Sequence, residues 1–197
     1  MIFTVAIDGP SAAGKGSIAA AIASAFGFAY LDTGLLYRAV AAKGGDPVAA
    51  ARDLTPADLA RPDLRTLQAG QDASRIATDP AVRAALLDFQ RRFARLDGGA
   101  VLDGRDIGTV ICPKADVKLF ITAEPEIRAH RRWLELGGDL AQVLAEVIER
   151  DRRDMGRSTA PLRPAKDAVL IDTSDMALDA AINLAQAVVQ VALEKRA

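Results

Sequence analysis

The chain has 197 residues, 50% of them hydrophobic and 26% charged, which suits one globular domain and excludes a disordered or collagen-like protein. The formal net charge of −1 at pH 7 provides no overall basic field for a nucleic acid, and the single cysteine, Cys112, excludes intramolecular disulfides and cysteine-based zinc sites. No apolar run reaches the roughly 18 residues of a membrane span. An apolar stretch covers residues 18–30, but Asp8 and a glycine-rich loop precede it where a signal peptide would be basic. We therefore expect a cytoplasmic monomer with no nucleic-acid or membrane partner.

Apolar runs predict five strands, and helical spacing of apolar residues predicts helices between them. The expected strands are 3–7, 30–32, 100–103, 117–121 and 168–171. The expected helices are 18–26, 36–42, 80–94, 125–136, 140–154 and 176–194. Between residues 43 and 73 the pattern is poor and glycine and proline recur, so we expect an insert or mobile subdomain there. Strands alternating with helices predict an α/β fold whose parallel sheet is covered on both faces.

A glycine-rich loop follows the first expected strand and opens the first helix. It consists of Gly9, Pro10, Ser11, Ala12, Ala13, Gly14, Lys15, Gly16 and Ser17. In such a loop backbone N–H groups converge on phosphate oxygens, the helix N-terminus adds the positive end of its dipole, and the lysine reaches the β and γ phosphates. A glycine-rich turn without a ligand is the alternative. The strand–loop–helix context favours a phosphate-binding loop (P-loop).

Two further clusters follow the second and third expected strands. Thr33 and Arg38 can bind an anion at the carboxyl end of the sheet, although Arg38 alone could equally be a surface residue. Asp103 can organise Mg²⁺ in a protein with a P-loop, and Arg105 can neutralise a transferring phosphate. Without the P-loop, this second cluster would be a simple turn. Arginine supplies 19 of the 25 basic residues, which reflects either anion recognition or coding bias.

The last cluster is the basic stretch 150–157, which contains four arginines. One interpretation is a solvated helix face, with Arg150 paired to Asp154 four residues later. The other is a lid that brings arginine onto a phosphate and excludes water. We favour the lid, because glycines at 137, 138 and 156 bracket the segment that would move.

Taken together and in this order, the motifs resemble those of bacterial cytidylate kinases, a branch of the nucleoside monophosphate kinases. The matching segments span residues 5–174 and read IDGPSAAGKGS, YLDTGLLYRA, VRAALLDFQR, LDGRDIGTV, RAHRRW, ERDRRDMGRSTAPL and AVLIDTS. The resemblance implies one P-loop kinase domain over 1–197, with a three-layer fold around five parallel strands. Its parts would be a core (1–36, 95–136 and 164–197), a helical monophosphate-binding insert (about 37–94) and a short lid (about 137–163).

The resemblance also implies roles for individual residues. The loop 9–17 would hold ATP, and Mg²⁺ would be held by ATP oxygens, water and Ser17, with Asp103 beside it. The acceptor phosphate would lie among Thr33, Arg38, Arg105 and Arg157, with Tyr37 in the same acceptor-binding motif. Cytosine would be read by Ser74, Arg83 and Asp106, and the ribose held by Arg150 and Asp154. The residues implied to act in catalysis are Lys15, Arg38, Arg105 and Arg157.

The function implied is ATP-dependent phosphorylation of CMP and dCMP to their diphosphates, by direct in-line transfer, in pyrimidine nucleotide metabolism. The alternative is a P-loop kinase of another small acceptor, such as UMP or a sugar acid. A GTPase-type switch would need a guanine-reading Asn-Lys-x-Asp motif, and the only asparagine, Asn183, has no lysine after it. Two departures from the family pattern are a threonine at Thr33, where serine is usual, and a short insert with 36 residues between Tyr37 and Ser74.

Overall fold

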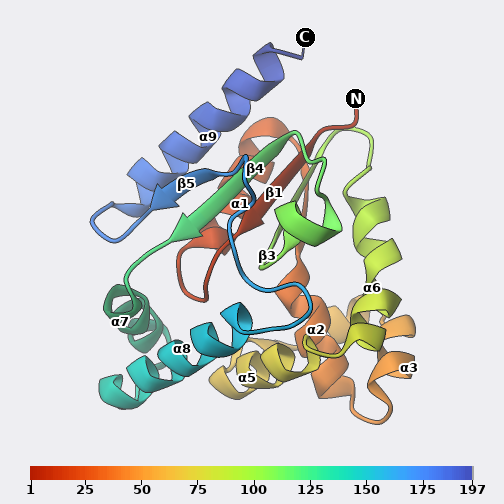
Figure 1. Cartoon of the computed structure of the whole chain (residues 1–197), viewed down its shortest axis with the longest axis vertical. Helices are drawn as coiled ribbons and strands as arrows, with labels where there is room; N and C mark the ends of the chain where they lie inside the picture. The colour runs from red at the N-terminus through yellow and green to blue at the C-terminus, as the bar shows by residue number, and fades with distance from the viewer. Residues whose placement is uncertain (197) are drawn as a thin grey trace.

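The computed structural model describes residues 1–196, which form a five-stranded parallel sheet with helices on both faces (Figure 1). The strand order is β2-β3-β1-β4-β5. The strands are β1 (Thr4–Asp8), β2 (Ala29–Asp32), β3 (Ala100–Gly104), β4 (Val117–Thr122) and β5 (Val169–Asp172). The long helices are α1 (Lys15–Phe26), α2 (Thr33–Lys43), α6 (Pro80–Phe93), α7 (Pro125–Leu136), α8 (Leu140–Met155) and α9 (Leu178–Glu194). All five predicted strands and the predicted parallel arrangement are confirmed.

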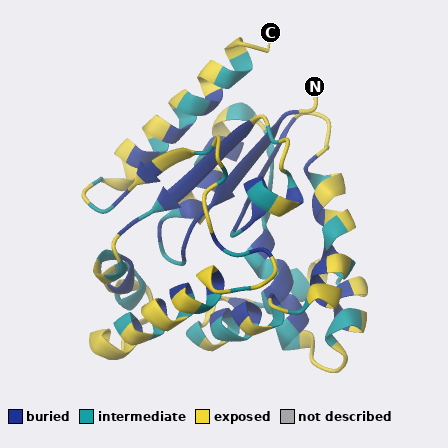
Figure 2. Cartoon of the chain, viewed as in Figure 1, coloured by how far each residue is buried: buried dark blue, intermediate teal, exposed yellow. Residues whose placement is uncertain are grey.

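Alternate residues of the central strand β1 build two separate cores, because successive side chains of a strand point to opposite faces of the sheet. Val5 and Ile7, together with Phe3 just before the strand, pack on one side with α1 and α9, and all three are fully buried. Ala6 packs on the other side with Leu102 of β3 and the turn at residues 107–111. Figure 2 shows the result as a buried sheet between helices whose outer faces are exposed.

The stretch with poor hydrophobic pattern is helical rather than irregular. It contains α3 (Pro47–Arg52), α4 (Pro56–Leu59), the 3₁₀ helix η1 (Pro62–Arg65) and α5 (Leu67–Ile76). Side chains of Asp46, Thr55 and Thr66 cap three of these helices, and prolines start α3, α4 and η1. Such short helices bury few residues each, so no long periodic pattern was visible. They pack with α2 and α6 around a small core of their own.

Three helix starts and one turn also differ from the sequence-based prediction. Helix α1 begins at Lys15, three residues earlier than expected. Helix α2 begins at Thr33, three residues earlier than expected, because the Asp32 side chain accepts a hydrogen bond from the Leu35 N–H (3.3 Å) and caps the helix. Helix α9 begins at Leu178 instead of residue 176. A π-helical turn, η2 (Ile107–Ile111), was not predicted. No helix within residues 1–196 is long and apolar enough to cross a bilayer.

Candidate active site

A cleft of about 540 Å³ lies where the strands end, between the sheet and helices α2, α5 and α8. In Figure 1 the strand arrowheads point toward the side where α8 and α5 lie. Most of the predicted site residues line this cleft. They are Ser11, Ala12, Gly14, Lys15, Gly16, Ser17, Thr33, Tyr37, Arg38, Ser74, Arg83, Asp103, Arg105, Asp106, Arg150, Asp154 and Arg157.

The three remaining residues of the predicted P-loop, Gly9, Pro10 and Ala13, do not line the cleft. Ala13 is fully buried in the main core. Gly9 has φ +149°, and a Cβ there would lie 1.9 Å from the Ile121 carbonyl oxygen, so only glycine fits against β4. Gly9, Pro10 and Ala13 therefore pack the loop against the rest of the protein, and the other six residues of the loop face the cleft.

The P-loop ends at an uncapped helix N-terminus. Gly14 adopts a left-handed conformation (φ 90°) immediately before α1, and no side chain caps the first turn of that helix. The free N–H groups and the helix dipole make such a terminus an anion-binding site. Lys15, the first residue of α1, is buried, and its Nζ donates a hydrogen bond to the Pro10 carbonyl oxygen at 2.7 Å.

The pKa values of Lys15 and of the nearby Asp103 shift in opposite directions. Burial, and then the positive charge of Arg105, lower the pKa of Lys15. Burial, and then the charge of Asp32, raise the pKa of Asp103. Both groups therefore lie in an environment that penalises their charged forms, and a charged ligand in the cleft would change that balance.

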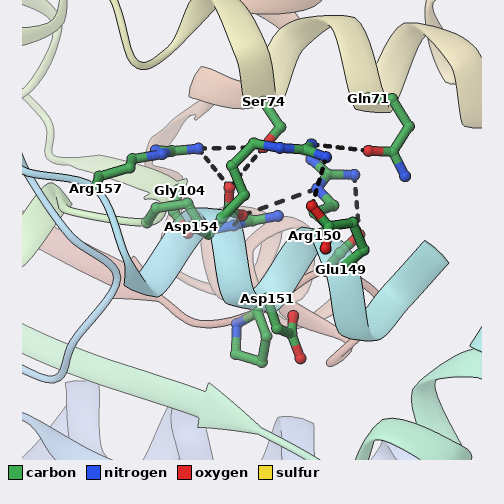
Figure 3. A network of polar contacts seen from close by, with 12 residues as sticks. Gln71, Ser74, Gly104, Glu149, Arg150, Asp151, Asp154 and Arg157 are labelled. Carbon is green, nitrogen blue, oxygen red and sulfur yellow. Dashed lines mark hydrogen bonds and ion pairs between the residues drawn. The ribbon is translucent and has the colours of Figure 1, made fainter. Parts of the chain in front are cut away.

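Asp154 of α8 is the centre of a buried polar network. Its carboxylate accepts hydrogen bonds from the Ser74 hydroxyl (2.7 Å), from Arg105 Nε (2.9 Å) and from Arg157 Nη2. Figure 3 shows Ser74, Arg157 and Arg150 grouped around Asp154. The network joins α5, the end of β3 and α8.

The network excludes a solvated helix face as the interpretation of Arg150 and Asp154. Arg150 Nε lies 3.8 Å from Asp154 Oδ2, and both side chains lie largely out of solvent. Solvated ion pairs do occur on the same helix, between Glu149 and Arg152, where both side chains are well exposed. The basic stretch therefore has one face in the cleft and one in solvent.

The cleft wall also contains two buried arginine N–H donors without a hydrogen-bond acceptor. The Nε atoms of Arg150 and Arg157 are buried and make no hydrogen bond within residues 1–196. A buried donor without an acceptor costs free energy, so such groups indicate a ligand that would supply one. Together with the uncapped P-loop, they indicate that the cleft binds an anionic, hydrogen-bond-accepting molecule.

The predicted base-reading residues Arg83 and Asp106 form a buried ion pair with each other. Arg83 Nη1 also lies 3.4 Å from the hydroxyl of Tyr37, to which it donates. Burial raises the pKa of Asp106, and the charge of Arg83 opposes that effect. The side-chain partner of Asp106 is therefore Arg83.

Thr33 and Arg38 connect the cleft to the neighbouring elements. The Thr33 hydroxyl donates to the Asp103 carbonyl oxygen at 2.7 Å. Arg38 donates to the Leu64 carbonyl oxygen in η1, and burial lowers the pKa of this arginine. Arg38 is therefore a half-buried residue of the cleft and not a simple surface arginine.

Several residues of the cleft were not predicted from the sequence. They include Tyr30, Asp32, Arg65, Arg132 and Glu135. Arg132 of α7 pairs with Glu135 (2.8 Å) and donates to the Arg65 carbonyl oxygen (3.1 Å), which links α7 to η1. The only sequence signal for Arg132 was the RAHRRW segment as a whole. Arg65 lies in the stretch with poor hydrophobic pattern, which gave no signal for it.

A metal site made by protein ligands alone is not present in the described chain, since no three His, Cys, Asp or Glu side chains of residues 1–196 gather to form one. Ser17 and Asp103, the predicted metal-binding residues, do line the same cleft as the P-loop. A hydroxyl and one carboxylate beside a phosphate-binding loop fit Mg²⁺, which keeps water and substrate phosphates as most of its ligands.

Solved structures with low sequence identity share the fold. A gluconokinase from Sinorhizobium meliloti 1021 superposes with a TM-score of 0.55 at 15% identity, over 99% of this chain and 96% of that chain. An uncharacterized protein from Eubacterium ventriosum ATCC 27560 gives a TM-score of 0.56 at 15% identity, over 93% of this chain and 96% of that chain. At this identity both likenesses support the α/β fold and nothing beyond it.

Sequence comparison identifies the family. A cytidylate kinase from Cereibacter sphaeroides (strain KD131) is 66% identical over 193 residues, which is 94% of each chain. A cytidylate kinase from Rhizobium meliloti (strain 1021) is 49% identical over 211 aligned positions, covering 100% of both chains. The family model named cytidylate kinase matches residues 5–44 and 53–191. The P-loop and its cleft thus lie within a match that extends over nearly the whole sequence, and the chain belongs to the cytidylate kinase family.

Proposed function

We propose that the chain transfers the γ-phosphoryl group of ATP to CMP and dCMP and releases the nucleoside diphosphates. The observation that carries this proposal is the position of the Arg83–Asp106 pair in the same cleft as Lys15 and the P-loop. A phosphate-binding loop and a buried pair of complementary hydrogen-bonding groups suit two nucleotides placed end to end. Family membership supports the same reaction.

The chain's own part in the reaction is alignment and charge neutralisation. The acceptor phosphate oxygen is already anionic, so no general base is needed. The P-loop amides and Lys15 would hold the donor phosphates. Arg38, Arg105 and Arg157 would surround the acceptor phosphate, with each guanidinium offering a planar fork to the oxygens. Mg²⁺, when held beside Ser17 and Asp103, would neutralise part of the triphosphate charge.

Two further roles complete the proposed site. Ser74 and the pair Arg83–Asp106 would bind the base, and Arg150 and Asp154 would bind the ribose. Closure of the lid over residues 137–163 would complete the arginine set and exclude water. The orphaned Nε atoms of Arg150 and Arg157 support this arrangement, because a bound nucleotide offers the acceptors that they lack.

The base assignment explains why CMP is proposed over UMP. Cytosine presents an amine donor and a ring-nitrogen acceptor, and uracil presents a carbonyl and an N–H at the same places. Asp106 can accept from the amine and Arg83 can donate to the ring nitrogen, so uracil would leave both buried groups mismatched. Each mismatch costs roughly 1–3 kcal/mol, so CMP should exceed UMP in kcat/KM by on the order of 10²-fold or more.

An acceptor panel tests the proposal. ADP release from ATP is measured in a coupled assay with CMP, dCMP, UMP, AMP and GMP as acceptors. We expect CMP and dCMP to be used best, and Asp106→Ala to depress CMP turnover much more than UMP turnover. Preference for another acceptor would refute the reaction, and a CMP to UMP ratio unchanged by Asp106→Ala would refute the base assignment.

A further inference from the structure

Asp8 is a buried carboxylate that none of the roles proposed above uses. It is the last residue of β1, 3% exposed, and it immediately precedes the P-loop glycine Gly9. Its two oxygens accept hydrogen bonds from two successive backbone amides, Ile107 N–H (2.7 Å) and Gly108 N–H (2.7 Å). No cationic side chain of residues 1–196 forms an ion pair with it. The carboxylate is therefore held by backbone amides alone.

Those two amides begin the π-helical turn η2, and Asp8 caps this turn from about a hundred residues away along the chain. The residue at the N-cap position of the turn is Asp106, whose side chain makes no capping hydrogen bond. An aspartate at an N-cap ordinarily accepts a hydrogen bond from the amide two or three residues later. Here the carboxylate of Asp106 binds Arg83 instead.

We infer that Asp8 is a positioning residue: by capping the turn at Ile107 and Gly108, it releases the carboxylate of Asp106 to face the cleft. Without Asp8, the unpaired amide of Gly108 would take Asp106 as its acceptor and draw this carboxylate away from Arg83. The expected effect on base selection rests on the proposed function. The exchange of capping partners does not, because it concerns only the hydrogen bonds of the turn.

The surroundings leave Asp8 little freedom to move. A Cβ on Gly108 would lie 3.3 Å from Asp8 Oδ2 and 3.2 Å from Lys118 Cδ, so the glycine backbone packs closely against the carboxylate. Asp8 also lies in register with Gly104 of β3, the residue before Arg105. One side chain thereby sets the start of the P-loop relative to the loop that carries Arg105 and Asp106.

A double-mutant cycle tests the inference. Asp8→Asn keeps the size of the side chain but offers only one acceptor oxygen to the two amides. We expect it to lower the CMP to UMP ratio of kcat/KM by about tenfold, a part of the loss expected for Asp106→Ala. In the Asp106→Ala background, Asp8→Asn should leave that ratio unchanged, because no carboxylate remains to be withdrawn. Equal effects of Asp8→Asn in both backgrounds would overturn the inference.

Asp116→Asn is the matched control. Its carboxylate also accepts a backbone amide of β1, that of Thr4 (2.7 Å), but at the opposite end of the strand. We expect this control to leave the CMP to UMP ratio unchanged. A fall in the control equal to that in Asp8→Asn would mean that any loosening of β1 has the same effect, and would overturn the inference.

The exchange of capping partners has a readout independent of activity. In the wild-type background, Asp106→Ala should leave the amide proton resonance of Gly108 near its original position, since Asp8 holds that amide. In the Asp8→Asn background, the same substitution should move this resonance much further, because Asp106 has become its acceptor. A Gly108 resonance that responds alike in both backgrounds would overturn the inference even if the acceptor of the enzyme were not CMP.

A second variant applies if Asp8→Asn does not fold. Gly108→Ala keeps the charge but presses a methyl group against Asp8 and Lys118. It should lower the CMP to UMP ratio in the same direction and by less. A folded Gly108→Ala protein whose ratio is unchanged would count against the inference. A wild-type protein with no CMP preference would refute the proposed base assignment instead, leaving the resonance experiment to decide on Asp8.

Discussion

Replacement of Asp154 by asparagine tests how the cleft is held together. The carboxylate is 1% exposed and accepts hydrogen bonds from Ser74, Arg105 and Arg157. Asp154→Asn preserves the size of the side chain but removes the negative charge that balances the arginines around it. Removing one partner of a buried ionic network leaves the other charges uncompensated, which is strongly destabilising.

The magnitude follows from the pKa of Asp154. Burial alone would raise it, but Arg105, Arg157 and Arg150 outweigh burial and hold it at about 2. Against the ordinary value of 3.8, such a shift corresponds to about 2.5 kcal/mol of stability at neutral pH, at roughly 1.4 kcal/mol per pKa unit. Because the folded-state pKa is the lower one, this stability is present above about pH 4 and is lost as the pH falls toward about 2.

Urea unfolding measured from neutral pH down to about pH 2 checks this reasoning. At neutral pH we expect Asp154→Asn to lower the free energy of unfolding by about 2 to 4 kcal/mol, and we expect the difference from wild type to shrink below about pH 4. Glu149→Gln on the same helix is the control, since its ion pairs are exposed and should contribute nothing measurable. A loss no larger than the control's, or one independent of pH, would refute the argument.

Further predictions concern the P-loop, the lid and Asp8. Lys15→Ala should lower kcat by on the order of 10²-fold or more without unfolding the protein, as steady-state kinetics and circular dichroism would show; near-normal turnover would contradict the phosphate-binding role. Gly9→Ala should lower the free energy of unfolding by at least about 2 kcal/mol, because its Cβ would collide with the Ile121 carbonyl oxygen; a wild-type melting curve would contradict this. Hydrogen exchange over residues 140–163 should slow when CMP and an ATP analogue are added together, and unchanged exchange would argue against a lid. Burial raises the pKa of Asp8 to about 6, so ionisation of this carboxyl group should lower the free energy of unfolding as the pH rises from about 4 to 6. This part of the pH dependence should vanish in Asp8→Asn, and an unaltered stability profile would contradict the raised pKa of Asp8.

The sequence predicted the features that depend on neighbouring residues. The loop 9–17 is one continuous segment that follows β1 as expected, although its last three residues already belong to α1. The five strands were visible as short apolar runs. In the three central strands β3, β1 and β4 this follows from burial on both faces, which requires apolar side chains almost throughout. The helices of residues 47–76 were missed as elements, because each is too short for a periodic signal and is held by caps and by packing against α2 and α6.

The partners of individual charged groups were decided only by the tertiary structure. Motif spacing predicted Asp106, Arg83, Asp154 and Arg105 as site residues, but it did not predict that Arg83 would pair with Asp106 or that Asp154 would bind Arg105. Their separations of 23 and 49 residues mean that the folded sheet and helices bring these groups together.

Asp8 is the clearest example of a residue whose partners were decided by the tertiary structure and not by the local sequence. In the sequence it is a lone aspartate before a glycine-rich loop, and nothing near it indicates a partner. Folding places β1 beside β3, so that the carboxylate meets two amides 99 and 100 residues away. Local sequence determined which backbone elements form, because it sets propensity and apolar pattern. The tertiary structure determined which polar groups meet, because buried donors and acceptors must be satisfied by whatever the packed elements bring within reach.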